Sequence, residues 1–351
     1  MTAPTDGCAP WDLVGADTAL ATLKSMLAEG RLPHALLLSG PRSVGKARLA
    51  RELACVLNHQ ESDCSQCRRI RAANHADVEV VAPGGLTLDA SSENSRSVVI
   101  TIGQIRRLEM LAAIHPYEGT HRVFIVDPAD KMTHDAADAF LKTLEEPAPF
   151  VTFVLVSARP ALLSDTIRSR CSELSVPPLS LESLTRWLVE DRELEAEQAL
   201  ALARLSRGRV GAAVEALAED DVFALRRGQI EEIRRLSEQG RPERFKFAEG
   251  LAGRGGDPAN ALIALEHWSA WWRDLLLIAL GSEAAITHRQ QIDELRESAR
   301  EYRPADLVRF LLALQSTAQT LRHGASPRLA LDVLFTQIPT RRAKPRAEAR
   351  P

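Results

Sequence analysis

A glycine-rich loop placed directly after a short apolar segment is the feature that most constrains this fold. The segment Ala35–Ser39 leads into the loop 40–47, which reads Gly-Pro-Arg-Ser-Val-Gly-Lys-Ala. Its spacing follows G-x-x-x-x-G-K-[ST], in which backbone N–H groups surround phosphate and the lysine reaches the terminal phosphates. The motif requires a buried strand before it and a helix after it, and the pattern predicts both, with the helix over 46–58. The sequence therefore predicts a P-loop α/β fold.

The nucleotide site that this loop predicts is incomplete at two positions. The motif ends in Ser or Thr because the hydroxyl ligates Mg²⁺, whereas Ala47 has no side-chain oxygen. After the apolar segment 123–126, Asp127 fits the metal-binding position, but Pro128 stands where an adjacent acid would activate water. We therefore expect ATP and Mg²⁺ not to be bound productively and the chain not to be catalytic by itself. The residues retained for a degenerate nucleotide site are Gly40, Gly45, Lys46 and Asp127.

The order of apolar segments predicts an α/β module followed by helices alone. Strand-like runs alternate with helical patterns over 1–178, which predicts a parallel sheet covered by helices on both faces. Beyond this module we predict a small helical cluster over 179–220, a larger helical domain over 221–340 and a disordered basic tail over 341–351. The predicted strands are 35–39, Val98–Ile102, 123–126 and 151–156, and the helices between them include 46–58, 104–114 and 135–145.

Composition narrows the class of protein and its surroundings. A net charge of −3 argues against a strongly basic nucleic-acid-binding protein. No apolar run approaches the roughly 20 residues of a membrane span, and Met1–Pro10 lacks the layout of a signal peptide. The five cysteines are few for 351 residues, so a disulfide scaffold is not expected. We expect a protein of the reducing cytoplasm with no membrane partner.

Three sequence segments resemble motifs of one known family. His34–Pro41 opens the loop as in bacterial sliding-clamp loaders, and Leu141–Pro147 is similar to their LLK-x-LEEP segment. Ser169–Cys171 matches their SRC motif. The resemblance covers residues 1–215 in the right order and extends weakly to Ser326–Leu331. Within this family of DNA polymerase III subunits, a degenerate loop is typical of the delta-prime branch and not of the gamma/tau ATPases.

The resemblance implies an architecture and a set of partners. The three predicted parts correspond to a RecA-like AAA+ module, a helical lid and a helical collar that holds subunits together. The resemblance also implies a hetero-oligomer with gamma/tau and delta subunits, which loads the sliding clamp onto primer–template DNA during replication. This chain would be a non-hydrolysing, stationary subunit of that complex and a component of the DNA polymerase III holoenzyme.

The resemblance further implies roles for individual residues. Arg170 corresponds to an arginine finger that inserts its guanidinium into the ATP site of an adjacent gamma/tau subunit. The alternative for Arg170 is a local role in which it pairs with a nearby acid. Gly211 stands in place of the sensor arginine that touches the phosphates in active loaders. Two other functions stay open: a weakly active gamma/tau-like ATPase, and a zinc-containing nucleic-acid-binding module outside replication.

Cysteine spacing indicates a second, partial site. Cys55, Cys64 and Cys67 occupy three of the positions that bind a structural Zn²⁺ in the resembled family, with the spacing C-x8-C-x2-C-x2-C. The fourth position is Ile70, which has no ligand atom, although structural zinc sites normally have four N or S ligands. Bound Zn²⁺ and a module that folds without metal both stay open. The side chains that would have to complete the shell are His59, Asp63 or His75.

Contact with DNA has a weaker basis in the sequence. Arg106 and Arg107 lie near the start of the helix predicted over 104–114, and a helix N-terminus with nearby arginines suits a DNA phosphate. The same two residues are equally compatible with ordinary surface charges. Tryptophans recur at helical spacing in the larger helical domain, and we predict that they pack between helices and do not stack on bases. They are Trp268, Trp271 and Trp272.

Overall fold

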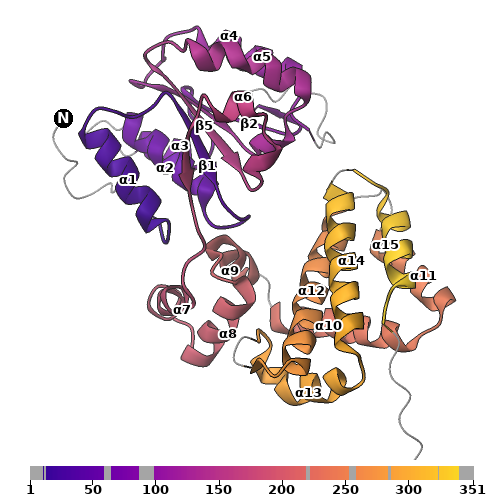
Figure 1. Ribbon diagram of the computed structural model, residues 1–351. Helices are drawn as coiled ribbons and strands as arrows, with labels where there is room; N and C mark the ends of the chain where they lie inside the picture. Colours follow the sequence, from indigo (N-terminus) through magenta and orange to yellow (C-terminus); the bar gives the residue numbers. More distant parts are fainter. Residues whose placement is uncertain are drawn as a thin grey trace, which may run out of the picture. The chain divides into compact units, whose positions relative to one another are not determined.

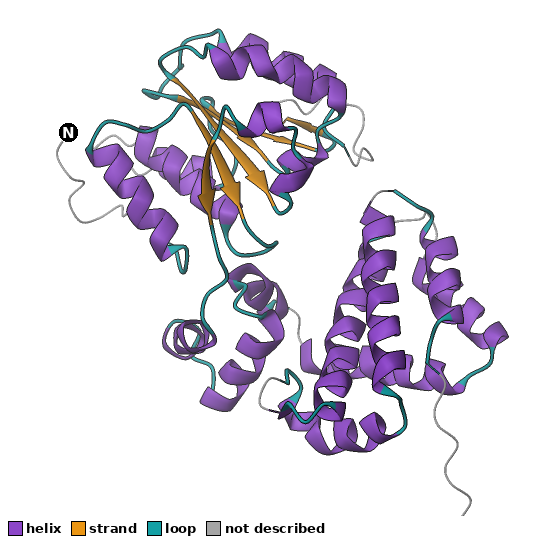
Figure 2. Cartoon of the chain, in the orientation of Figure 1, coloured by secondary structure: helices purple, strands orange, loops and turns teal. Residues whose placement is uncertain are grey.

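Two compact units make up the chain. The computed structural model describes residues 11, 13–58, 65–86, 99–218, 222–252, 258–283, 286–322 and 324–339. The units are Met1–Glu215 and Ala216–Pro351 (Figure 1). The first contains a sheet with its covering helices and most of the small helical cluster, and the second is helical over its described residues (Figure 2). The predicted basic tail lies outside the described residues.

A six-stranded sheet forms the centre of the first unit. Its strands are β1 Ala35–Ser39, β2 Val78–Ala82, β3 Gly85–Leu86, β4 Arg122–Val126, β5 Val151–Ser157 and β6 Ser172–Ser175. The order is β3-β2-β4-β5-β1-β6, and all neighbours are parallel except β2 and β3, which pair antiparallel. β1, β4 and β5 are buried along their whole length, as strands covered on both faces must be. The predicted α/β fold is confirmed, with one antiparallel edge strand added.

Helices cover both faces of this sheet, because successive strand residues point to opposite sides. The helices are α1 Asp17–Ala28, α2 Lys46–Asn58, α3 Ser65–Arg71, α4 Ile102–Ala112, α5 His134–Glu145 and α6 Asp165–Arg168. Leu37, Phe124 and Phe153 share one apolar core with residues of α4, α5 and α6. Leu36 and Ile125, one position along their strands, share the other core with α1, α2 and α3. Both faces of the sheet are therefore buried (Figure 1).

The strand predicted over Val98–Ile102 is wrong over residues 99–102, and Val98 lies outside the described residues. Ile100 forms only an isolated parallel bridge with Met132, and α4 begins two residues further on. The start of α4 is fixed by Gln104, whose Oε1 accepts a hydrogen bond from the Thr101 backbone N–H at 2.9 Å. This capping contact stabilises the start of a helix directly after the bridge residue Ile100, so the strand does not continue. The helices and strands of the first unit that the sequence pattern did not identify are α1, α3, α6, β2, β3 and β6.

Three short helices follow the sheet, within residues 179–220. They are α7 Leu181–Glu190, α8 Ala196–Ser206 and α9 Val210–Leu217, the last of which crosses the unit boundary. α7 begins after Ser180, whose Oγ accepts from the Ser183 backbone N–H at 3.0 Å. Gly208, between α8 and α9, has a φ of 75°, and a Cβ atom there would lie 2.1 Å from the Leu179 carbonyl oxygen. Only glycine fits this turn.

The second unit is built around a tryptophan-rich core. Its helices are α10 Val222–Glu238, α11 Arg241–Ala252, α12 Ala259–Ala279, α13 Ile292–Arg300, α14 Pro304–Arg322 and α15 Pro327–Thr336. Trp268, Trp271 and Trp272 of α12 are at most 2% exposed, and the Trp272 ring lies 4.9 Å from that of Phe310 in α14. The prediction that these tryptophans pack between helices is confirmed. Over the described residues of both units, we find no helix that is long and apolar enough to cross a membrane.

Candidate functional site

The glycine-rich loop joins the end of β1 to the start of α2, as its motif requires. Gly40 has a φ of 144°, and a Cβ atom there would lie 2.2 Å from the Val176 carbonyl oxygen. Gly45 has a φ of 99°, a conformation that side chains rarely adopt. The two glycines therefore allow the chain to turn tightly from the strand into the helix. The strand and the helix that the sequence predicts on either side of the loop are both present.

Lys46 folds back onto this loop. Its Nζ donates a hydrogen bond to the Gly40 carbonyl oxygen at 2.7 Å and another to the Pro41 carbonyl oxygen. Burial lowers the pKa of Lys46 from its ordinary value, although the nearby charge of Asp127 opposes the shift. Burial likewise raises the pKa of Asp127, and the Lys46 charge opposes that shift. The structure thus brings Lys46 and Asp127 into one buried electrostatic environment, in which a phosphate would have to replace the carbonyl contacts of Lys46.

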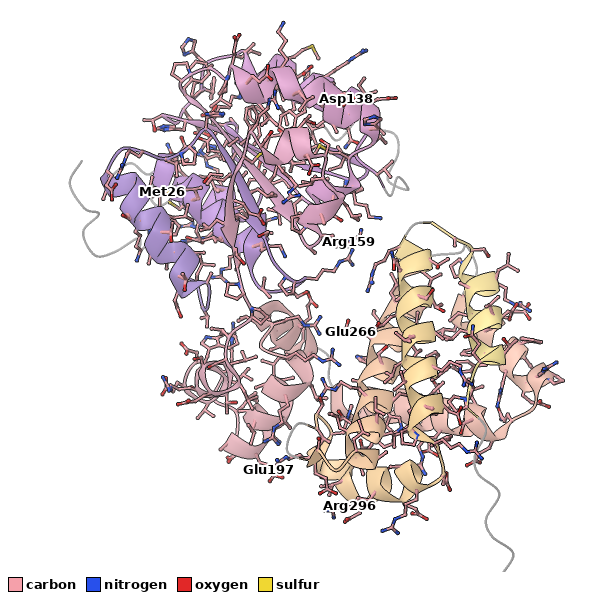
Figure 3. The ribbon with its side chains drawn as sticks, viewed as in Figure 1. Met26, Asp138, Arg159, Glu197, Glu266 and Arg296 are labelled. Carbon is pink, nitrogen blue, oxygen red and sulfur yellow. The ribbon has the colours of Figure 1, made fainter. Side chains whose placement is uncertain are left out.

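Asp130, two residues after Pro128, has hydrogen-bond partners for both of its carboxylate oxygens. Asp130 Oδ1 accepts from Ser157 Oγ at 2.8 Å, and Oδ2 accepts from Arg159 Nη2 at 2.9 Å (Arg159 is labelled in Figure 3). The Asp130 side chain is only 3% exposed. It is therefore not free to activate water in place of the missing acid. Sequence reasoning missed this group because its members are up to 29 residues apart along the chain.

The lid helix α9 begins in direct contact with the loop. The Gly211 backbone N–H donates to the Ser43 carbonyl oxygen at 2.7 Å. A Cβ atom at Gly211 would lie 2.8 Å from that same oxygen, closer than real Cβ contacts allow. In this arrangement the backbones of α9 and the loop approach each other so closely that a side chain at the sensor position does not fit. Gly211 and the loop are thus placed together, as the resemblance implied.

Arg170 lies two residues after the end of α6 and is tied to a neighbouring acid. Its Nε donates to Glu145 Oε1 at 2.7 Å, Nη2 donates to the same oxygen, and Nη1 donates to the Thr166 carbonyl oxygen at 2.9 Å. The Arg170 side chain remains 32% exposed. The local pairing considered as an alternative for Arg170 is therefore present. Glu145 and Thr166 were not identified from the sequence, although Glu145 belongs to the quoted LEEP-like segment.

The residues on either side of Arg170 fix this short segment to the unit. Ser169 Oγ donates to the Thr166 carbonyl oxygen at 3.0 Å. Cys171 packs against the apolar core shared with α4 and α5, and burial raises the pKa of its thiol to about 12. Arg168 instead contacts Asp165 at 3.3 Å on the surface, as expected for a supporting charge. The Ser-Arg-Cys motif thus consists of two anchoring residues and one partly exposed arginine.

The structure brings two of the three candidate zinc ligands together. Cys55 in α2 and Cys67 in α3 are both buried, and Cys55 Sγ donates to the Cys67 carbonyl oxygen at 3.7 Å. Burial raises the pKa of the Cys55 thiol well above its ordinary value. Ile70 lies in the apolar core. Cys64 lies outside the described residues, within which no group of three or more His, Cys, Asp and Glu side chains is placed to hold a metal.

These contacts do not fit a closed zinc site over the part of the chain that the structure describes. Of the other side chains considered as ligands, His59 and Asp63 also lie outside the described residues. His75 is buried, and its Nδ1 accepts from the Asp77 backbone N–H at 3.1 Å, which removes that nitrogen as a ligand. Zinc bound through Cys64 stays a prediction, and elemental analysis of the purified chain tests it.

Ion pairs attach α3 to its surroundings instead. Arg71 donates from Nε and Nη2 to the two carboxylate oxygens of Glu52, at 2.7 and 2.8 Å, and Glu52 is fully buried. Arg69 makes a similar two-bond pair with Glu118, at 2.7 Å for each bond. Such paired hydrogen bonds are strong and directional. The sequence did not identify these residues, because acids and bases from 19 to 49 positions apart carry no local pattern.

Arg106 and Arg107, the candidate DNA contacts, are exposed on the first turns of α4. This position is compatible with a phosphate contact and with an ordinary surface charge. Neither alternative is favoured by the hydrogen bonds at this end of α4, where Gln104 Nε2 donates to the Ala82 carbonyl oxygen at 2.7 Å. DNA binding by these arginines stays a prediction.

The fold and the site together define a class of protein. A phosphate-binding loop between β1 and α2, a mostly parallel sheet covered on both faces, and a small helical cluster in contact with the loop make this an AAA+ type of P-loop protein. Comparison with known families then narrows the class. The model of a family described as "DNA polymerase III, delta subunit" matches residues 15–180. Over much of its length the chain is similar to subunits of DNA polymerase III.

Individual relatives are similar over most of this chain. It is 27% identical over 313 residues to DNA polymerase III subunit delta' of Bacillus subtilis, covering 87% of this chain and 90% of that protein. It is 28% identical over 348 residues to DNA polymerase III subunit tau of Escherichia coli, covering 92% of this chain but only 52% of that protein. A gamma subunit-related protein of Thermotoga maritima, of known structure, has 17% identity and a TM-score of 0.40, with 90% of this chain and 97% of that one covered. Nothing about function follows from a structural similarity of that size.

Proposed function

We propose that this chain is the delta-prime-type, non-hydrolysing subunit of a DNA polymerase III clamp loader. Its partners are then gamma/tau-type and delta-type subunits, and through the complex it acts on the sliding clamp and primed DNA. Arg170 acts as an arginine finger at the ATP bound by an adjacent gamma/tau-type subunit. There it neutralises charge that develops during phosphoryl transfer. Hydrolysis at that neighbouring site completes the loading of the clamp.

The observation that carries this proposal is the state of the chain's own loop site. Ala47 provides no metal ligand, and Pro128 provides no base. Asp130, an acid two residues after Pro128, is bound by Ser157 and Arg159. Catalysis of phosphoryl transfer consists mainly of placing charges and metal ions, so a site without them hydrolyses ATP poorly. A chain with such a site contributes to an ATPase through a group that it gives to a neighbour.

Exposed apolar side chains on the second unit support a role in assembly. Leu312 of α14 and Leu329 and Val333 of α15 are each at least 60% exposed. Large apolar side chains that gather on a surface commonly mark protein–protein contacts. Leu329 and Val333 are four residues apart on one helix and therefore lie on the same face. We expect this face to be covered by another subunit in the assembled complex.

Substitution of Arg170 tests the proposal in a reconstituted complex with gamma/tau-type and delta-type chains. We expect Arg170→Ala to leave assembly intact and to lower clamp- and DNA-stimulated ATP hydrolysis sharply, since a finger is worth about 10³-fold or more at the site it serves. Arg168→Ala is the matched control, because Arg168 is a surface arginine two residues away that pairs only with Asp165 among the contacts described here. Wild-type ATPase activity in the Arg170→Ala complex would refute the finger.

A weakly active gamma/tau-like ATPase is the second candidate function. It is favoured by the part of the motif that the sequence retains, which is Gly40, Gly45 and Lys46. Steady-state ATP turnover by the purified chain separates the two candidates. Turnover that Lys46→Ala abolishes would support the ATPase and contradict the non-hydrolysing role.

A further inference from the structure

The guanidinium of Arg170 is held by two different helices of the first unit. Two of its N–H groups, on Nε and Nη2, donate to Glu145 Oε1, and Nη1 donates to the Thr166 carbonyl oxygen. Glu145 is the last residue of α5, and Thr166 lies in α6. A guanidinium has five N–H donors, so three are engaged and two remain for another acceptor. The side chain is thus fixed without being saturated.

Glu145 has two opposite effects on a catalytic arginine, because a carboxylate both orients a guanidinium and competes for it. The Glu145 side chain is 49% exposed and that of Arg170 is 32% exposed, so water screens their attraction. The charge that develops on a phosphoryl group in a water-excluded site attracts a cation more strongly than one screened carboxylate does. The orientation that Glu145 gives to the Arg170 guanidinium comes from the directions of their hydrogen bonds, and solvent screening does not change those directions. The orienting effect therefore outweighs the competition.

The place of Glu145 in its helix agrees with this conclusion. Glu145 ends α5, and an acid in the last turn of a helix is unfavourable because the helix dipole already places negative charge there. The cation of Arg170 offsets this cost. Glu146, the next residue, is also exposed, but α5 ends before it. The ion pair with Arg170 thus explains why an acid is tolerated at the C-terminal end of α5.

We propose that Glu145 is a positioning residue for Arg170. It holds the long arginine side chain in one orientation before the neighbouring subunit docks, so that this order need not be created during catalysis. The inference rests on the proposed function, since Glu145 has this role only if Arg170 acts at a neighbour's ATP. Arg170 is the group that meets the phosphates, and Glu145 acts only through it.

The kinetics of the reconstituted complex test this role. We expect Glu145→Ala to lower kcat for DNA-stimulated ATP hydrolysis about tenfold, because a misplaced catalytic group loses rate without losing binding. The KM for ATP and subunit assembly should not change. Glu145→Gln keeps an acceptor oxygen and should lose less activity than Glu145→Ala. The matched control is Glu146→Ala, which should behave as the wild type.

A double substitution separates positioning from a general structural effect. In an Arg170→Ala background, Glu145→Ala should cause no further loss, because its effect passes through Arg170. A further loss in that background, or a raised ATPase rate in the Glu145→Ala complex without DNA, would overturn the positioning role. Normal activity of Glu145→Ala beside an inactive Arg170→Ala would refute positioning and leave the finger standing. Normal activity of Arg170→Ala itself would refute both.

Discussion

At the residue scale, three positions of the loop site lack a group that an active ATPase would have. They are Ala47, Pro128 and Gly211. Ala47 and Pro128 lack chemical groups that hydrolysis needs, and the sequence shows this directly. Gly211 differs, because its hydrogen bond of 2.7 Å to the Ser43 carbonyl brings two backbones into contact. A helix that donates a backbone N–H group to the loop stabilises the loop itself. The loop is therefore also a packing contact for α9.

This contact predicts that even a methyl group at position 211 is costly. We expect Gly211→Ala to lower the free energy of unfolding by about 1–3 kcal/mol, the usual cost of overpacking, since the obstructing atom belongs to the Ser43 backbone. Urea unfolding of the full chain measures it. Gly103→Ala in α4 is the control, because a Cβ atom there meets only Thr101 Oγ1 at 3.8 Å. Equal stability of Gly211→Ala and the wild type would show that α9 does not press on the loop.

At the element scale, α3 shows how a short helix is retained by side chains from distant segments. It has seven residues, too few to be stable alone. Cys67 and Ile70 pack into the core, while Arg71 and Arg69 pair with acids of α2 and of the segment after α4. Two thiols, one apolar residue and two ion pairs therefore occupy the region where the resembled family has a metal. The apolar side chains hold one face of α3 in the core, and the two ion pairs fix the orientation of the helix.

The pair of Arg71 with Glu52 gives the clearest test of this arrangement. Arg71→Ala leaves the fully buried Glu52 carboxylate without its guanidinium, although the Trp11 backbone N–H still donates to it at 3.0 Å. Breaking a buried pair costs about 3–5 kcal/mol, and because Arg71 itself is 35% exposed we expect about 2 kcal/mol in urea unfolding. Arg68→Ala, an exposed arginine of the same helix, should change stability by no more than about 0.5 kcal/mol. A similar effect of both substitutions would contradict the role of the pair.

At the scale of the whole molecule, each unit fixes a loop with one buried aspartate. In the first unit, Asp77 accepts from the backbone N–H groups of residues 117, 118 and 119, at 2.6, 2.9 and 2.8 Å. In the second, Asp274 of α12 accepts from the Thr287 and His288 backbone N–H groups at 2.8 and 2.9 Å, and from His288 Nδ1 at 2.8 Å. Burial alone would raise the pKa of each aspartate, but these hydrogen bonds outweigh it and lower both.

The lowered pKa values predict acid sensitivity of both units. A carboxylate whose pKa is lower in the folded state adds stability above its unfolded pKa, about 3.9 for Asp, and that stability is lost as the pH falls through the folded pKa. We therefore expect the free energy of unfolding to fall below about pH 4, and Asp274→Asn to weaken this dependence in the second unit. Three of the five tryptophans lie in that unit, so tryptophan fluorescence follows mainly its unfolding; they are Trp268, Trp271 and Trp272. Asp293→Asn, at a 92% exposed side chain, is the control, and an unaltered pH profile in Asp274→Asn would contradict the assignment.

Much of the fold was predictable because local patterns encode it. The apolar run at 35–39 and the loop after it set a strand, a turn and a helix, all of which are found at the predicted positions. The helices beyond residue 180 follow from their apolar periodicity in the same way. Val98–Ile102 failed as a strand because a short apolar run fits either element, and the pairing of Thr101 with Gln104 decided for a helix. β6 was missed because its exposed residues alternate with half-buried ones and leave little apolar pattern.

The sequence by itself determined the class of fold, the defects at Ala47 and Pro128, and the position of Arg170, because each of these depends on residue type and local spacing. Only the tertiary structure decided what those residues touch. It placed Glu145 on Arg170, Arg159 and Ser157 on Asp130, and the backbone of α9 on the loop. The physical reason is that hydrogen bonds and ion pairs act over a few ångströms in space, whereas their partners here lie 25 or more residues apart along the chain.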